Sequence, residues 1–180
     1  MKKIIAILTT LFFLGSNFSS QAQDANNTHV QNSDSLAALM RKVFTGFHFQ
    51  DVRSKNIFTY ESMPDNEPIM LMYFRSDCGH CNITAAEVRD YMEWYPIQLW
   101  MVSAEPMETI KTFVKKYELD KARNTKLMQD DTKGMHQWFD FKYIPYVVLI
   151  DKSGNLIKEF HSLPKPKEIQ DFLKELELAD

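Results

Sequence analysis

The sequence predicts an α/β domain in which helices cover both faces of a mixed β-sheet. From residue 69 onward, apolar segments of strand length alternate with amphipathic helical segments, an order that is typical of a partly parallel sheet. The last two strand segments are joined by a short turn, so they predict an antiparallel hairpin that makes the sheet mixed. The 180 residues, 44% of them hydrophobic and 25% charged, are enough for one globular domain with a substantial core.

Five segments have the composition of β-strands. The segment Ile69–Phe74 is apolar throughout, as expected for a strand that is buried on both faces of a sheet. The segments Ile97–Ser103 and Tyr146–Ile150 have a similar character, and the turn residues after the second of them predict a hairpin with Leu156–Phe160. A shorter strand is expected at Lys126–Met128.

Four segments carry helical signals. The first extends from Gly79 to about Tyr95 and stops before Pro96, because proline cannot continue a helix. Its apolar side is expected to consist of Ile83, Ala86, Val88, Tyr91 and Trp94. A second helix is expected to begin at Pro106, since proline suits the first helical position. A short helix within Asp131–Trp138 and an amphipathic helix over Lys167–Leu178 complete the pattern.

The first 22 residues have the layout of a secretory signal peptide. Lys2 and Lys3 provide a positive start, and Ile4–Leu14 is a mainly apolar run that is shorter than the about 20 residues that span a bilayer. The small residues Ser20 and Ala22 precede the expected cleavage point, which lies after Ala22. We therefore expect an exported, periplasmic protein that contacts a membrane only through this segment before cleavage.

The rest of the chain is expected to contain a linker and one domain. Residues 23–35 are polar and without periodicity, which predicts a linker, and the domain is expected over residues 36–180. Apolar residues between Phe47 and Tyr60 suggest extended segments near an edge of the sheet. The formal net charge of −3 provides no broad basic face, so nucleic acid is not an expected partner.

The only two cysteines, Cys78 and Cys81, are three positions apart. A disulfide that closes so small a ring adds little stability, so a structural staple is a poor explanation for the pair. In an exported protein, a lone C-x-x-C indicates a reactive pair or half of a metal site.

The position of Cys78 favours a reactive thiolate. The residue lies between a buried strand and the first turn of a helix, where unpaired N–H groups and the helix dipole favour an anion. His80 can add a cationic or hydrogen-bonding imidazole, whereas the carboxylate of Asp77 opposes a second negative charge. Arg75 could offset Asp77, although we expect it to be a solvated surface arginine. We expect the favourable effects to prevail, so that the exposed Cys78 attacks a disulfide and the deeper Cys81 resolves the mixed disulfide.

The sequence resembles the thioredoxin superfamily in two segments. The first is Leu71–Phe74, followed after a short turn by C-G-H-C and a helix. The second is Tyr143–Asp151 followed by Ser153 and Gly154. The resemblance covers residues 69–180, the expected redox core, and is greatest to the extracytoplasmic TlpA-like and ResA-like proteins of bacteria. It implies a three-layer thioredoxin-like fold with an N-terminal extension.

The resemblance also implies the roles of residues outside the cysteine pair. In this family a cis-proline that faces the disulfide follows an apolar residue, which here makes Pro145 the cis-proline and places Ile144 before it. A cis bond is otherwise found at about 5–6% of such positions, so the expectation is specific. Tyr143 and Tyr146 flank this proline and either line a shallow substrate groove with Ile144 or pack in the core.

Two positions depart from the thioredoxin pattern. Met72 occupies the place of a buried aspartate that relays a proton in thioredoxins, and Asp77 replaces the tryptophan that usually precedes the first cysteine. A proton would then reach the site through Glu87, Asp131 or water, and the sequence does not choose among them.

Three functions are compatible with these residues. The leading hypothesis is an enzyme without a bound cofactor that exchanges disulfides with protein substrates and with an unidentified redox partner. The first alternative is a carrier of copper or zinc that uses Cys78, Cys81 and a histidine from the group His80, His136 and His161. The second is a thioredoxin-like binding module without catalysis, which the intact C-G-H-C argues against.

Overall fold

The computed structural model describes residues 47–64, 67–151 and 156–177. The expected signal peptide, the expected linker, the first part of the expected domain and the turn at Ser153 and Gly154 lie outside these residues. Among the described residues, no helix is both long and apolar enough to cross a membrane.

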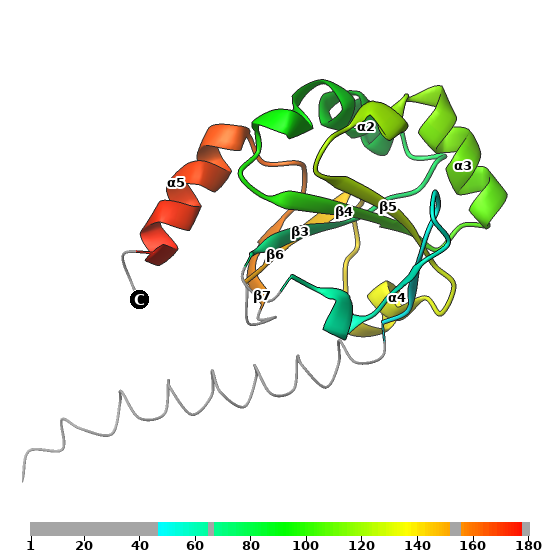
Figure 1. The fold of residues 1–180 in the computed structure, drawn as a ribbon, viewed down its shortest axis with the longest axis horizontal. Coiled ribbons are helices and arrows are strands. Elements are labelled where there is room, and N and C mark those ends of the chain that lie inside the picture. The colour runs from blue at the N-terminus through cyan, green and yellow to red at the C-terminus, as the bar shows by residue number, and fades with distance from the viewer. Residues whose placement is uncertain (1–46, 65–66, 152–155, 178–180) are drawn as a thin grey trace, which may run out of the picture.

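One mixed sheet contains the seven strands of the described part of the chain (Figure 1). In their order across the sheet they are β2 (Ile57–Phe58), β1 (Phe49–Asp51), β5 (Thr125–Asp130), β4 (Gln98–Ser103), β3 (Ile69–Tyr73), β6 (Tyr146–Ile150) and β7 (Leu156–Phe160). The central strands β3, β4 and β5 are parallel, and every other neighbouring pair is antiparallel. The mixed α/β architecture and the closing hairpin are therefore confirmed.

The central strands are buried on both faces. Alternate side chains of a strand point to opposite sides of the sheet, and a hydrophobic core covers each side. One core contains Met70, Met72, Leu99, Met101, Leu127, Val147 and Leu149. The opposite core contains Ile69, Leu71, Tyr73, Trp100, Val102, Met128, Tyr146, Val148 and Ile150. The strand methionines Met70, Met72 and Met101 are fully buried, so they serve as core residues.

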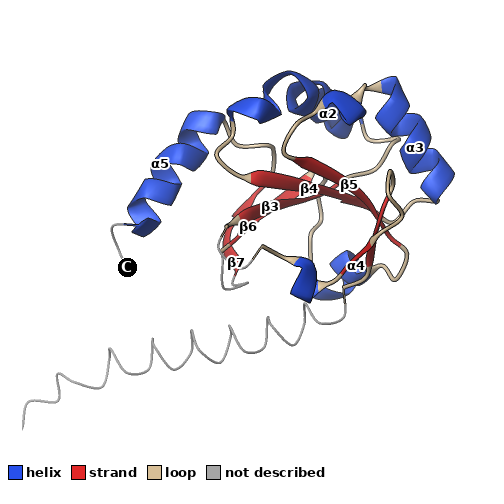
Figure 2. Cartoon of the chain, in the orientation of Figure 1, coloured by secondary structure: helices blue, strands red, loops and turns tan. Residues whose placement is uncertain are grey.

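Helices cover each face of the sheet (Figure 2). The first core is closed by α2 (Gly79–Tyr91), α3 (Met107–Lys116) and α5 (Pro166–Glu177). The opposite core is closed by α4 (Gly134–Trp138) and by the segment that contains the 3₁₀ helix η1 (Tyr60–Ser62). Figure 1 shows α2 and α3 on one side of the strands and α4 on the other, which is the expected three-layer arrangement.

The boundaries of the helices differ slightly from the sequence prediction. Helix α2 ends at Tyr91 and a separate 3₁₀ helix, η2 (Met92–Trp94), continues to Tyr95. Pro106 is the N-cap of α3 rather than its first residue. A further 3₁₀ helix, η3 (Leu119–Lys121), follows α3.

The predicted apolar side of α2 is confirmed at Val88 but is wrong at its three largest residues. Ile83, Tyr91 and Trp94 are 62%, 55% and 69% exposed, whereas the buried residues of α2 are Cys81, Thr84, Ala85 and Val88. Thr84 and Ala85 face the core although they are less apolar than the aromatic residues, which are on the exposed side. Trp100, in β4, is buried, whereas Trp94 is a surface residue.

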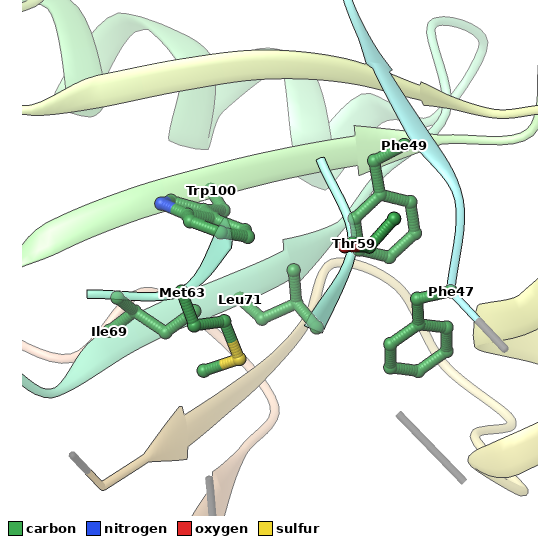
Figure 3. Close-up of a pocket in the computed structure, with 7 residues that line it drawn as sticks. All are labelled: Phe47, Phe49, Thr59, Met63, Ile69, Leu71 and Trp100. Atoms are coloured by element: carbon green, nitrogen blue, oxygen red, sulfur yellow. The ribbon is translucent and has the colours of Figure 1, made fainter. Parts of the chain in front are cut away.

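A small apolar cavity lies on the face of the sheet opposite α2 (Figure 3). Its volume is about 10 Å³, and it is lined by Phe47, Phe49, Thr59, Met63, Ile69, Leu71 and Trp100. Such a volume holds at most about one water molecule, and the lining is almost entirely apolar. The cavity is therefore a gap in the packing of β1 and η1 against the sheet, not a ligand site.

Candidate active site

The two cysteines lie where strand β3 passes into helix α2. Phe74 is fully buried, and its N–H donates to the carbonyl of Val102 at 3.0 Å, which fixes the end of β3 against β4. The segment Arg75–Asp77 then leads to Cys78, which is the N-cap residue of α2. This position at a helix N-terminus is the one that the sequence predicts.

Cys78 takes the place that a serine or aspartate side chain usually takes at a helix start. Its Sγ accepts a hydrogen bond from the N–H of Cys81 at 3.1 Å, which satisfies one of the free donors of the first turn. Its carbonyl accepts from the N–H of Asn82 at 3.0 Å. The side chain is partly exposed, so its sulfur is accessible to another protein while a backbone donor points at it. This donor and the helix dipole both favour negative charge on the sulfur.

Cys81 lies one turn deeper in α2 and is completely buried. Burial, followed by a hydrogen bond with Cys78, raises the pKa of the Cys81 thiol to about 12. A hydrogen bond from the backbone of Arg75 acts in the opposite direction and favours the Cys81 thiolate. Both thiols are free.

Arg75 and Asp77 form an ion pair in the segment before Cys78. The guanidinium donates from Nε to Oδ1 at 2.9 Å and from Nη2 to Oδ2 at 2.6 Å. This pair lowers the pKa of Asp77 and raises the pKa of Arg75. Arg75 is exposed as expected, but it is engaged with Asp77, so the carboxylate next to Cys78 is paired with a cation.

The loop before β6 faces Cys78. The peptide bond between Ile144 and Pro145 is cis, the isomer that the resemblance implies. The Sγ–H of Cys78 donates to the carbonyl of Ile144 at 3.6 Å, so residues 66 positions apart meet at the sulfur. Ile144 is partly buried and packs against both cores, and its carbonyl lies beside the sulfur of Cys78, so its place in a substrate groove stays a prediction.

Tyr146 packs in the interior, which is one of the two possibilities that the sequence leaves open. It is 4% exposed, and its ring stacks on Phe141 with a centroid distance of 4.9 Å. Burial, followed by a hydrogen bond with Glu159, raises its pKa. The assignment of Tyr146 to a substrate groove is therefore corrected, because its alternation along β6 points it into the core. Tyr143, on the other side of the proline, is 73% exposed.

The structure separates the other polar residues that the sequence singles out. His80 is exposed on the first turn of α2, and His161 is exposed after β7. His136 is bonded to the hydroxyl of Tyr73 at 2.7 Å on the opposite face of the sheet. Throughout the described part of the chain, no three side chains of His, Cys, Asp or Glu are grouped as a metal site, so the three-ligand set of the carrier hypothesis is not assembled.

The proposed proton routes also differ in their placement. Met72 is fully buried where thioredoxins carry an aspartate. Glu87 is exposed on α2. Asp131 is an exposed residue after β5 that is paired with His48 at 3.3 Å.

A carboxylate that is not among the residues predicted from the sequence contacts the segment before Cys78. Glu105, which follows β4, accepts hydrogen bonds from both the N–H and the Oγ–H of Ser76. A signal for this contact exists in the sequence, because Ser76 and Glu105 follow strands that are adjacent and parallel. Polar residues at the carboxyl ends of adjacent parallel strands meet at one edge of a sheet.

The two thiols should differ strongly in their reaction with iodoacetamide. At pH 8 we expect the native, reduced protein to gain one carbamidomethyl group, on Cys78, because Cys81 is buried and its pKa is about 12. The Cys81 thiolate becomes populated only as the pH rises toward 12, so its modification should increase across that alkaline range. Peptide mass spectrometry locates each adduct, and protein unfolded in urea should gain both at pH 8. Equal modification of the two cysteines in the native state would contradict this difference.

The chain is similar to known thioredoxin-like proteins in sequence and in structure. A family model described as a thioredoxin-like domain matches residues 60–177. A search of curated protein sequences gives no match.

Three solved structures illustrate the structural similarity. A thioredoxin-like protein from Aeropyrum pernix is 16% identical with a TM-score of 0.57, and the match covers 84% of this chain and 99% of that one. A secreted disulfide oxidoreductase from Mycobacterium tuberculosis, homologous to the DsbE protein of E. coli, is 16% identical with a TM-score of 0.57 over 74% and 98% of the two chains. A thio-disulfide isomerase from Thermus thermophilus is 18% identical with a TM-score of 0.55 over 74% and 91%.

These similarities include all parts of the site described above. The matched residues contain strand β3, both cysteines and the proline loop. The match also extends over more than half of the sequence. The chain therefore belongs to the thioredoxin-like domain family.

Proposed function

We propose that this protein is an exported thiol–disulfide oxidoreductase that exchanges disulfides with protein substrates through Cys78 and Cys81. One observation carries the proposal: the partly exposed Sγ of Cys78 accepts a backbone hydrogen bond at the start of α2, while the fully buried Cys81 lies one turn behind it. The carbonyl of Ile144 beside the same sulfur supplies a main-chain wall against which an extended substrate can lie.

The reaction proceeds in two exchanges. The Cys78 thiolate attacks one sulfur of a substrate disulfide, whose S–S bond breaks, and the released substrate thiolate takes up a proton. The product is a mixed disulfide between Cys78 and the substrate. Cys81 then loses its proton, and its thiolate attacks Sγ of Cys78, which releases the second substrate thiol. The dithiol of the enzyme is oxidised to a disulfide, and two electrons pass to the substrate.

Because Cys81 is buried, the exchange at Cys78 precedes the exchange at Cys81. With a pKa of about 12, Cys81 is protonated at neutral pH and does not compete with Cys78 for a substrate. It attacks only a sulfur that is already held at the start of α2. The proton that it releases passes to water or to the departing substrate thiolate.

The proposal also includes the export of the protein and the direction in which its active site transfers electrons. The N-terminal sequence pattern supports export, and the secreted relative from Mycobacterium tuberculosis is consistent with it. His80 stabilises the reduced thiolate, so the site is a milder reductant than thioredoxin, whose potential is about −270 mV. A second redox protein recharges the site after each cycle.

Insulin reduction tests the activity directly. With dithiothreitol as the electron donor, the wild-type protein is expected to accelerate the precipitation of insulin B chains, and Cys78→Ala is expected to match the rate without enzyme. Refolding of scrambled ribonuclease tests the isomerase direction with the same control. A wild-type protein that is no faster than Cys78→Ala in both assays would refute the proposed function.

A further inference from the structure

We propose that Glu105 is a positioning residue for the active site, which it holds in place through Ser76. This inference rests on the proposed disulfide exchange, because it concerns how the same two sulfurs are placed. Glu105 lies after β4 and does not belong to the C-x-x-C segment or to the proline loop.

The contact between Glu105 and Ser76 uses every donor that Ser76 has. The N–H of Ser76 donates to Oε2 of Glu105 at 2.7 Å, and the Oγ–H of Ser76 donates to Oε1 at 2.6 Å. Both bonds are short, as charge-assisted hydrogen bonds are. They are partly buried, so water competes with them less than at an open surface. The carboxylate therefore clamps the backbone two residues before Cys78.

Glu105 is itself held by two strands of the sheet. Its Oε2 accepts from the Oγ–H of Ser103 at 3.2 Å, and its N–H donates to the same Oγ at 3.3 Å. Its carbonyl accepts from Nε2 of Gln129, in β5, at 3.0 Å. Ser103 is fully buried at the end of β4. Glu105 is thus anchored to β4 through its carboxylate and N–H and to β5 through its carbonyl, and it transmits their position to the segment Arg75–Asp77.

That segment contacts both sulfur-bearing residues. The carbonyl of Arg75 accepts the N–H of Cys78 at 3.3 Å, and the backbone of Arg75 makes the hydrogen bond that favours the Cys81 thiolate. Ser76 is the next residue, so the clamp on Ser76 fixes the peptide groups on either side of it. Loss of the clamp frees the backbone donor that assists Cys81 when it loses its proton. The effect should therefore appear mainly in the second exchange.

A chromogenic disulfide separates the two exchanges. Reduced protein reacts with 5,5′-dithiobis(2-nitrobenzoate), and attack by Cys78 releases the first thionitrobenzoate. Attack by Cys81 on the mixed disulfide releases the second. In Glu105→Ala we expect the second phase to slow roughly tenfold at pH 8, the effect of one lost charge-assisted hydrogen bond, with a smaller change in the first phase. The pH midpoint of the second phase should also move upward.

Three further variants isolate the clamp from general damage to the fold. Glu105→Gln keeps an acceptor for Ser76 and should restore most of the second-phase rate. Ser76→Ala keeps the backbone donor, should fold normally and should slow the second phase less than Glu105→Ala does. In the Glu105→Ala background the Ser76→Ala change should add nothing, because the two residues act as one unit. Glu108→Gln removes an exposed carboxylate nearby, paired with Lys111, and should behave as the wild type.

The outcomes distinguish this inference from the proposed function. If the wild-type protein releases only the first thionitrobenzoate, Cys81 does not resolve the intermediate and the proposed function fails. If the wild type completes both phases and folded Glu105→Ala shows the same second-phase rate and pH midpoint, the proposed function stands and the role of Glu105 is refuted. A lower melting temperature with unchanged second-phase kinetics would also refute it, because a merely structural role predicts that result.

Discussion

Substrate proteins are expected to remain attached to the Cys81→Ser variant through a stable mixed disulfide with Cys78. Cys78 retains its exposure and the backbone N–H of residue 81 as a donor, so the first exchange still occurs. Serine cannot attack a disulfide, so the intermediate has no internal route to resolution. Turnover of insulin should therefore fall to the background level. Non-reducing electrophoresis and intact mass spectrometry measure the adduct.

The matched control for this trap is Cys78→Ser. It keeps a hydroxyl at the N-cap of α2 and should leave the fold unchanged, since serine is a favoured N-cap residue. The remaining thiol of Cys81 is buried and has a pKa of about 12, so this variant should capture no substrate at neutral pH. Equal capture by the two variants would show that the cysteines do not have distinct roles.

Replacement of Asp130 by alanine is expected to lower the free energy of unfolding by about 3 kcal/mol, because it leaves buried N–H groups without acceptors, each at a cost of about 1–3 kcal/mol. The Asp130 side chain is fully buried at the end of β5. Its Oδ1 accepts from the N–H of Gly134 at 2.9 Å and its Oδ2 accepts from the N–H of Met135 at 2.9 Å. Oδ1 also accepts from Oγ1 of Thr132 at 3.0 Å. The carboxylate thus attaches α4 to the sheet.

The neighbouring residue Asp131 provides a control with the same change in charge. It is exposed and is paired only loosely with His48, so Asp131→Ala should change the free energy of unfolding by less than about 0.5 kcal/mol. Urea unfolding followed by circular dichroism at pH 7 gives both values, provided that the dependence on denaturant is the same. Similar losses in the two variants would show that the buried bonds of Asp130 are not the source of its contribution.

The strands and the cysteine site are predictable from sequence because their signals are local. An apolar run such as that of β3 has few alternatives to a buried strand, and β6 is equally distinct. The place of Cys78 at a helix start follows from the strand before it and the helical pattern after it. The buried second cysteine then follows from the geometry of one helical turn.

The buried face of α2 is not predictable from hydrophobicity alone. Because Tyr91 and Trp94 are large and aromatic, a prediction from hydrophobicity places them on the buried side of the helix. Both are on the surface. The correct face contains Cys81, Ala85 and Val88, whose spacing is helical but whose side chains are small. The packing of α2 against the sheet determines which side of the helix is buried, and the side chains on that side are not the largest ones.

The hydrogen bonds between Glu105 and Ser76 cannot be predicted from local sequence patterns, for a different reason. The two residues are 29 positions apart, and the contact exists only because β3 and β4 are adjacent and parallel. A strand order must be assumed before such a pair can be proposed. The burial of Tyr146 has a similar origin, because it depends on the register of β6 against β3.

Strands β1 and β2 precede the segment that the family model matches. Strand β1 pairs along the outer side of β5, and β2 pairs with β1. The last three residues of β5, Met128 to Asp130, are therefore paired with β1 on the side opposite to β4. Without β1, β5 would have an unpaired edge to which a strand of another molecule could add. The outermost strand, β2, contains only two residues and offers a poor template for such growth. The N-terminal strands thus replace β5 at this edge of the sheet with a much shorter strand.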